Sequence, residues 1–312
     1  MTPLRIIFAG SGEFGVPTLV ALRDAGHAIA NVITQPDRPA GRGRGVTPTP
    51  IAQWASKAGL PVIATDNINA LSLPESDLMV VIAFGQKIAR PVIEKPRLGA
   101  INLHASRLPK YRGAAPINWA ILNGDAISGN SIIRLADRMD AGAVLAISRV
   151  EIGPTETAGE LHDRLSLDGV ALMLKTIEEL ATGKAIETPQ DESLATIAPK
   201  LSRKSAMLDF SKPAAVVCRT IHGLHPWPGC RVKVCDAEGA DIARLRLVRA
   251  EVAVEDGPRW EAGEITSAGT VQCGDYTLRI LELQPDGGKP MKMEDYRRGH
   301  RWQAGLRLQA VE

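Results

Sequence analysis

Residues 4–15 read LRIIFAGSGEFG, an apolar run of strand-forming residues that leads directly into a glycine-rich turn. Pro17 then stands where the first turn of a helix tolerates proline, and Leu19, Val20 and Leu22 give that helix an apolar face. A strand, a tight turn and a helix in this order begin a βαβ unit. The stretch therefore predicts the first part of a mostly parallel, doubly wound α/β sheet.

The same alternation of strands and helices continues over the first two hundred residues. Further apolar, β-branched runs predict strands at Ala28–Thr34, Leu78–Ala83, Ala100–His104, Ser131–Leu135 and Val144–Arg149. Helical patterns fit Ile51–Ala58, Ile117–Asn123 and Ala158–Ala181.

After about Ser202 the pattern changes to shorter strands separated by turn residues. They are predicted at Arg231–Cys235, Ala243–Val254, Gly263–Thr266 and Thr277–Leu283. A chain of 312 residues is long for one domain, so we expect two. The first domain is expected to span residues 1–189 and to be followed by a linker over residues 190–204. The second domain, a smaller β-barrel of OB-like type, is expected to span residues 205–312.

Composition restricts the class of protein without identifying it. With 45% hydrophobic and 23% charged residues, the chain has the balance of a globular enzyme. No apolar run approaches the roughly 18 residues of a membrane span, and the start resembles a strand rather than a secretory signal. We expect a cytoplasmic monomer. The net charge of +2 permits polyanion binding but does not require it.

The four cysteines all lie in the last third of the chain. They stand at positions 218, 230, 235 and 273, and no two have the close spacing of a zinc site or a redox pair. We therefore expect buried, reduced thiols and no metal.

The turn at residues 10–15, GSGEFG, matches the dinucleotide-binding pattern G-x-G-x-x-G, so a nicotinamide-dependent oxidoreductase is one alternative. Such a site also needs an acid at the end of the second strand to hold the ribose. That strand ends VITQP at position 36, and Asp37 lies beyond the proline. A tight turn that lets the helix pack on the sheet is the preferred interpretation, with no bound nicotinamide.

Residues 99–116, GAINLHASRLPKYRGAAP, hold the densest group of reactive side chains. Alternation along a strand places Asn102 and His104 on one face at its carboxyl end, the edge where open α/β sheets bind ligands. The loop after the strand Ser131–Leu135 can bring Asp140 to the same edge. A capping Asn and a satisfied buried His are the alternative interpretation.

An amide, an imidazole and a carboxylate suit acyl transfer to an amine. The amide or the charged imidazole can donate to the oxyanion, and the carboxylate can favour the charged imidazole or relay a proton. No Ser or Cys nucleophile is needed when the acceptor amine attacks directly. The residues alone thus indicate acyl or one-carbon transfer.

Four motifs resemble the folate-dependent formyltransferase family: NLH at 102–104, S-x-L-P-x-x-R-G at 106–113, Pro116, and MDAG at 139–142. The resemblance implies a Rossmann-like formyltransferase sheet and 10-formyltetrahydrofolate as co-substrate, without metal or nicotinamide. It implies that the catalytic residues are Asn102, His104 and Asp140. The residues beside the folate would be Ser106, Arg107, Leu108 and Pro109, with the pterin against backbone near Phe84, Gly85 and Gln86. The family's usual tetrapeptide is SLLP, so the side chain of Arg107 is expected to face solvent.

Other motifs resemble one branch of this family, the methionyl-tRNA formyltransferases: TQPDRPAGRG at 34–43, TPTP at 47–50, VVIAFG at 80–85 and PWP at 226–228. This resemblance implies formyl transfer to the α-amino group of initiator methionyl-tRNA. On flexible loops arginines can contact phosphates, so Arg38, Arg42 and Arg44 are predicted to bind the acceptor stem, although a solvated turn is the alternative. Candidate contacts in the barrel are Arg231, Lys233, Lys289, Lys292, Arg297 and Arg298.

Two further alternatives stay open. A sugar-nucleotide N-formyltransferase would keep Asn102, His104 and Asp140 without needing the arginine loop or this second domain. A pure RNA-binding module would not need those three residues.

Overall fold

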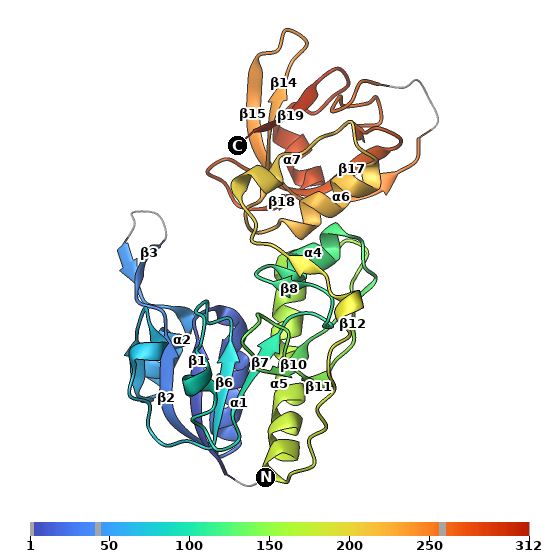
Figure 1. The fold of residues 1–312 in the computed structure, drawn as a ribbon. Helices are drawn as coiled ribbons and strands as arrows, with labels where there is room; N and C mark the ends of the chain where they lie inside the picture. The colour runs from blue at the N-terminus through green and yellow to red at the C-terminus, as the bar shows by residue number, and fades with distance from the viewer. Residues whose placement is uncertain (1–2, 41–44, 256–259, 312) are drawn as a thin grey trace. The chain divides into compact units, whose positions relative to one another are not determined.

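The computed structural model describes residues 3–40, 45–255 and 260–311 (Figure 1). The chain divides into two compact units. The first unit contains residues 1–113, 128–150 and 162–198, and the second contains 114–127, 151–161 and 199–312. The chain therefore passes between the units several times instead of crossing once.

A seven-stranded sheet forms the first unit, in the order β11-β10-β7-β6-β1-β2-β5. Its strands are β1 (Arg5–Gly10), β2 (Ala28–Thr34), β5 (Val62–Ala64), β6 (Leu78–Ile82), β7 (Ala100–His104), β10 (Ser131–Arg134) and β11 (Val144–Ile147). The five from β5 to β7 in this order run parallel, whereas β10 and β11 are antiparallel to their neighbours. The predicted α/β sheet, mostly parallel, is confirmed.

Helices and short strands complete the description of the chain before residue 200. The helices are η1 (Glu13–Gly15), α1 (Val16–Asp24), α2 (Pro50–Lys57), η2 (Ile68–Ala70), α3 (Arg90–Ile93), α4 (Pro116–Leu122), α5 (Ala158–Ala181) and η3 (Glu192–Leu194). The short strands are β3 (Arg38–Ala40), β4 (Gly45–Thr47), β8 (Arg112–Gly113), β9 (Ile127–Ser128), β12 (Val150–Glu151) and β13 (Ile197–Ala198). β3 pairs with β4 in an antiparallel hairpin, and β8 pairs with β13 in parallel.

The glycine turn after β1 brings two strands very close together. A Cβ atom on Gly10 would lie 2.8 Å from the carbonyl oxygen of Ile82, the last residue of β6. A side chain at this position would overpack the centre of the sheet. Close packing thus explains the turn's glycine without a bound dinucleotide.

The second unit is a nearly closed antiparallel barrel with strand order β16-β17-β15-β14-β19. Its elements are η4 (Arg203–Ala206), α6 (Ala214–Gly223), β14 (Cys230–Cys235), β15 (Asp241–Ala253), β16 (Val271–Gln272), β17 (Thr277–Pro285), β18 (Met291–Lys292), α7 (Met293–Gly299) and β19 (Arg307–Val311). Isolated bridges from Glu264 to Arg307 and from Ile265 to Val271 connect the two end strands. The strand predicted at Gly263–Thr266 was wrong in detail, because these residues form only such bridges.

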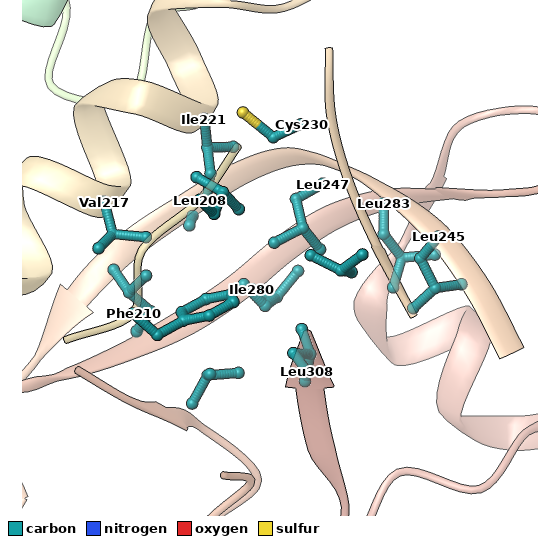
Figure 2. Close-up of a cluster of buried hydrophobic side chains, with 14 of the residues drawn as sticks. Leu208, Phe210, Val217, Ile221, Cys230, Leu245, Leu247, Ile280, Leu283 and Leu308 are labelled. Atoms are coloured by element: carbon teal, nitrogen blue, oxygen red, sulfur yellow. The ribbon is translucent and has the colours of Figure 1, made fainter. Parts of the chain in front are cut away.

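The barrel has its own hydrophobic core, in which α6 packs on β15 and β17 (Figure 2). Phe210, Ile221 and Leu247 are buried there. Each such side chain contributes about 2 kcal/mol by leaving water. This unit therefore stabilises itself through its own apolar contacts.

All four cysteines lie buried and unpaired in this second unit. Burial raises the pKa of Cys218 to about 11 and those of Cys230 and Cys273 to about 12. The thiols are thus protonated near neutral pH, as expected for reduced core cysteines. Within the described ranges no group of three or more His, Cys, Asp or Glu residues is placed to hold a metal ion. Nor does any helix described in these ranges have the length and apolarity to span a membrane.

Candidate active site

His104 ends β7 with its ring buried and its two nitrogens in different surroundings. Nε2 lies 2.8 Å from the carbonyl oxygen of Tyr111, which can only accept a hydrogen bond. The neutral ring therefore carries its proton on Nε2. Nδ1 lies 3.7 Å from Oδ2 of Asp140. This second nitrogen is the one left to gain a proton beside a carboxylate.

Asp140 reaches His104 from the loop that follows β10. β10 runs antiparallel to β7, with Ser131 opposite His104 and Arg134 opposite Ile101. The loop after β10 therefore begins beside the start of β7 and then runs back toward the end of β7, where His104 lies. Asp140 has a left-handed φ of 53°, and its Oδ2 accepts the N–H of Gly113 at 2.8 Å. The loop thus brings the acid and the imidazole together.

Asn102 precedes His104 by two residues on β7, so alternation places both side chains on one face. Its side chain is half-buried, and its amide makes no hydrogen bond to any residue in the described ranges. This differs from the capping role of the alternative interpretation. The amide is available to a ligand.

Hydrogen bonds to Lys110 and Ser131 fix the backbone of the tetrapeptide Ser106–Pro109. Ser106 Oγ donates to the carbonyl of Lys110 at 2.7 Å, and Ser131 Oγ joins Ser106 to Leu108 by accepting the Leu108 N–H and donating to the Ser106 carbonyl. Ser106 and Leu108 are buried, whereas Arg107 is exposed and Pro109 half-buried. The side chain of Arg107 thus faces solvent, as expected from its departure from the SLLP pattern.

Side-chain hydrogen bonds also hold the segment Phe84–Gln86 in place. The carbonyl of Phe84 accepts hydrogen bonds from Gln35 Nε2 at 3.2 Å and from Ser11 Oγ at 3.5 Å. The amide of Gln86 accepts from the backbone of Ile68 and donates to that of Thr65. Gly85 has a φ of 78°, which turns the segment tightly. The side chain of Gln86 is therefore occupied, and any contact with a heterocycle would come from backbone.

The arginine loop is only partly described. Arg38 is exposed and donates from Nη2 to Oε1 of Gln35 at 2.9 Å. Since Gln35 also binds the carbonyl of Phe84, one side chain connects the base of this loop to the Phe84–Gln86 segment. Arg42 and Arg44 lie outside the described residues.

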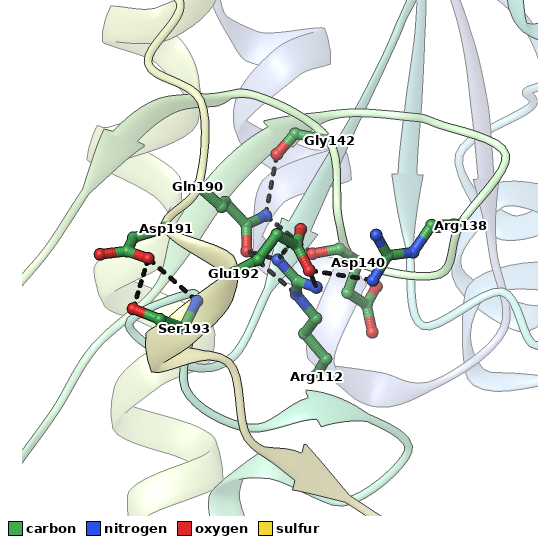
Figure 3. Close-up of polar contacts among 8 residues, drawn as sticks. All are labelled: Arg112, Arg138, Asp140, Gly142, Gln190, Asp191, Glu192 and Ser193. Atoms are coloured by element: carbon green, nitrogen blue, oxygen red, sulfur yellow. Dashed lines mark hydrogen bonds and ion pairs between the residues drawn. The ribbon is translucent and has the colours of Figure 1, made fainter.

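A polar cluster around the Asp140 loop was missed by sequence reasoning (Figure 3). The buried Arg112 binds Oε1 of Gln190 and both carboxylate oxygens of Glu192. Glu192 also accepts a hydrogen bond from Arg138 in the loop, and these two arginines lower the pKa of Glu192 to about 2. Arg112 was recognised only as part of a motif, and QDE at 190–192 has no periodic pattern that could mark it.

Two family models match this chain over most of its length. The family model "Formyl transferase" matches residues 4–177, and "Formyl transferase, C-terminal domain" matches residues 200–301. The class of protein that this fold and site define is thus a formyltransferase.

Relatives define the branch. A methionyl-tRNA formyltransferase of Methylococcus capsulatus is 41% identical over 98% of this chain and 99% of its own, and one of Moorella thermoacetica is 39% identical over 95% and 96%. The chain belongs to the methionyl-tRNA formyltransferase family, as the sequence motifs predict.

Solved structures support the fold at greater distance. WlaRD, a sugar 3N-formyl transferase, is 16% identical with a TM-score of 0.65, over 89% of this chain and 97% of its own. HypX from Aquifex aeolicus, solved with tetrahydrofolic acid, has 17% identity and a TM-score of 0.61, over 95% of this chain and 47% of its own. At such identities these likenesses concern the fold alone.

Proposed function

We propose that this protein transfers the formyl group of 10-formyltetrahydrofolate to the α-amino group of methionyl initiator tRNA, giving N-formylmethionyl-tRNA. The observation that carries the proposal is the placement of His104 Nδ1 at 3.7 Å from Asp140 Oδ2, with the unbonded amide of Asn102 on the same strand face. Relatives that match nearly the whole chain have this activity in their names.

The formylated folate supplies a carbonyl carbon bound to nitrogen, and the residues supply charge and protons. Asn102 donates a hydrogen bond to the oxygen on which negative charge develops. His104 takes the proton of the attacking amine on Nδ1 and returns it to the leaving nitrogen. Asp140 favours the charged imidazole between these two events, directly or by ordering a relay water. Since Nε2 is bonded to Tyr111, the imidazole stays oriented throughout.

For the folate we propose the two segments whose backbone is fixed from behind, Ser106–Pro109 and Phe84–Gln86. The side chains of Ser106 and Gln86, with that of the neighbouring Ser131, hold part of this main chain, and the remaining peptide groups of the two segments would meet the flat heterocycle. Residues of both segments lie in the first unit. We place catalysis in residues 1–189 together with the start of the following segment, whose Gln190 contacts the Asp140 loop, and tRNA binding chiefly in 205–312.

For the tRNA we propose the loop with Arg38, Arg42 and Arg44, and one face of the barrel. Arg231 on β14 and Arg246 on β15 are cross-strand partners, and neither makes an ion pair with any residue that the structure describes. Like charges directly opposite each other are unfavourable without an anion between them. Trp227, 54% exposed in the segment before β14, adds an aromatic surface on which a base can stack. A nucleic acid supplies both partners, phosphates for the two arginines and a base for the indole of Trp227.

Incubation with 10-formyltetrahydrofolate and methionyl initiator tRNA, followed by detection of formylmethionine, tests the proposal. Transfer to an amino sugar nucleotide but not to the tRNA would favour the sugar N-formyltransferase alternative. We also propose a cytoplasmic monomer, which sedimentation of the purified protein and fractionation of cells would test.

A further inference from the structure

The segment from Thr188 to Ala198 contacts the supports of both His104 and Asp140. Oγ1 of Thr196 accepts the N–H of Tyr111 at 2.8 Å, and the carbonyl of Thr196 accepts the N–H of Arg112 at 2.8 Å. Tyr111 in turn holds the ring of His104. The same short segment carries Gln190, whose side chain points at the Asp140 loop (Figure 3). It is therefore part of the site's framework.

We propose that Gln190 is a positioning residue for formyl transfer, which sets the carboxylate of Asp140 against His104 by holding two backbone carbonyls of its loop; this rests on the function proposed above. Nε2 of Gln190 donates to the carbonyl oxygens of Asp140 and Gly142, both at 2.8 Å. Oε1 accepts from Nε and Nη2 of Arg112, at 3.1 and 2.8 Å. These four bonds use every donor and lone pair of the amide, which fixes its orientation.

The loop needs such an anchor because of its backbone conformation. Asp140 has a φ of 53°, in the left-handed region that side-chain-bearing residues disfavour. Such a conformation persists only where the surroundings hold it. The two donated bonds act on Asp140 itself and on the residue two positions later. Arg112, which fixes the other side of Gln190, is itself buried and bonded to Glu192.

A competing role for Gln190 is only to satisfy the buried guanidinium of Arg112. Gln190→Glu separates the two roles, because a carboxylate still accepts from Arg112 but cannot donate to the carbonyls of Asp140 and Gly142. We expect Gln190→Glu to lower kcat about 10- to 100-fold, as small misplacements of a catalytic group do, while KM for both substrates changes less than about threefold. If the role is only to satisfy Arg112, kcat stays at the wild-type value, which would overturn the proposal.

Gln53→Glu is the matched control. Gln53 is an exposed glutamine of the first unit whose amide donates to the carbonyl of Pro48 at 2.9 Å. The Gln53→Glu substitution introduces the same change of charge away from the Asp140 loop, so we expect the kcat of this variant to stay within about twofold of wild type. Gln190→Ala serves as the second variant should Gln190→Glu fold poorly, and the same loss of kcat is expected.

A double-mutant cycle shows whether Gln190 acts through Asp140. In an Asp140→Asn background, Gln190→Glu should lower kcat less than about threefold, because the carboxylate it positions is already gone. Losses that multiply independently would overturn the proposal.

A readout without turnover is the ¹⁵N NMR spectrum of His104 in histidine-labelled protein at a fixed pH. Gln190→Ala, which adds no charge, should move the ring ¹⁵N resonances of His104 while Gln53→Ala leaves them in place, and unchanged resonances in both variants would refute the positioning role. Absence of formyl transfer by the wild-type protein would instead refute the proposed function, and this spectrum would still decide the role of Gln190.

Discussion

Tyr111 and Asp140 lie beside different nitrogens of one imidazole, with the Tyr111 carbonyl 2.8 Å from Nε2 of His104 and the Asp140 carboxylate 3.7 Å from Nδ1. The carbonyl fixes the orientation of the ring, and the carboxylate lies beside the nitrogen that carries no proton in the neutral ring. The distance to Asp140 leaves Nδ1 without a direct hydrogen bond, so an incoming proton has a vacant acceptor. The effects of substitutions should follow from this asymmetry.

Asp140→Asn removes the negative charge but keeps the shape of the side chain. We expect kcat to fall about 10²- to 10⁴-fold, with a similar loss for His104→Ala. Asn102→Ala should cost about 10²- to 10³-fold, the usual loss for one oxyanion donor. Single-turnover formylation rates measure these effects, and thermal unfolding checks that each variant is folded. Near-wild-type rates for any two of the three would refute the proposed roles.

Arg42→Ala should raise KM for the tRNA and flatten its dependence on salt. Each lost phosphate contact lowers the slope of log affinity against log salt by roughly 0.7–0.9. Arg42→Lys should keep most of that slope, because the charge remains. Arg90→Ala is the control, since Arg90 is an exposed arginine of the first unit that pairs with Glu94. An unchanged KM for Arg42→Ala at moderate salt would contradict the assignment.

Arg246→Gln should improve stability while it weakens tRNA binding. The substitution relieves the cross-strand repulsion with Arg231, an effect of about 0.2–1 kcal/mol on the free energy of unfolding. Arg279→Gln is the control, because Arg279 pairs with Glu251 across strands of the same barrel. It should lose stability slightly and bind tRNA as before. Equal tRNA affinity for wild type and Arg246→Gln would argue against this face.

The buried His222 should make the chain sensitive to mild acid. Burial, and then the nearby Arg249, lower the pKa of His222 from 6.5 to about 4, and its Nε2 accepts the N–H of Ala250. Between pH 6.5 and pH 4 the unfolded chain binds a proton that the folded chain excludes. Stability from this group is therefore complete above pH 6.5 and is lost as pH falls toward 4, by about 3 kcal/mol in total.

Urea unfolding at several pH values measures the effect of His222. His222→Gln retains an acceptor for Ala250 but does not titrate, so the free energy of unfolding should fall less between pH 6.5 and 4 than in wild type. Parallel pH dependences for the two proteins would show that His222 is not the responsible group. His225, whose pKa burial and then Arg246 also lower, acts in the same direction in both proteins.

Local pattern predicted the sheet well, and long-range contacts explain what it missed. The bounds of β2, β7 and α5 agree with the prediction because apolar runs and helical spacing are local signals. The loop after β10 was expected to bring Asp140 to the edge where His104 lies, but local pattern does not reveal that β10 runs antiparallel to β7. Gln190 lies 78 residues from Arg112, and no local rule connects an amide to a guanidinium at that separation.

The placement of the cysteines gives the protein an internal chemical probe of its own folding. Because the thiols lie only in the barrel and are shielded there, a pulse of alkylating reagent would label the chain only when the barrel opens. Unfolding of the first unit alone would expose no thiol and would leave the chain unlabelled, so it has to be followed by a separate measurement. Mass spectrometry of the labelled protein could thus determine in which order the two units unfold, with no engineered reporter.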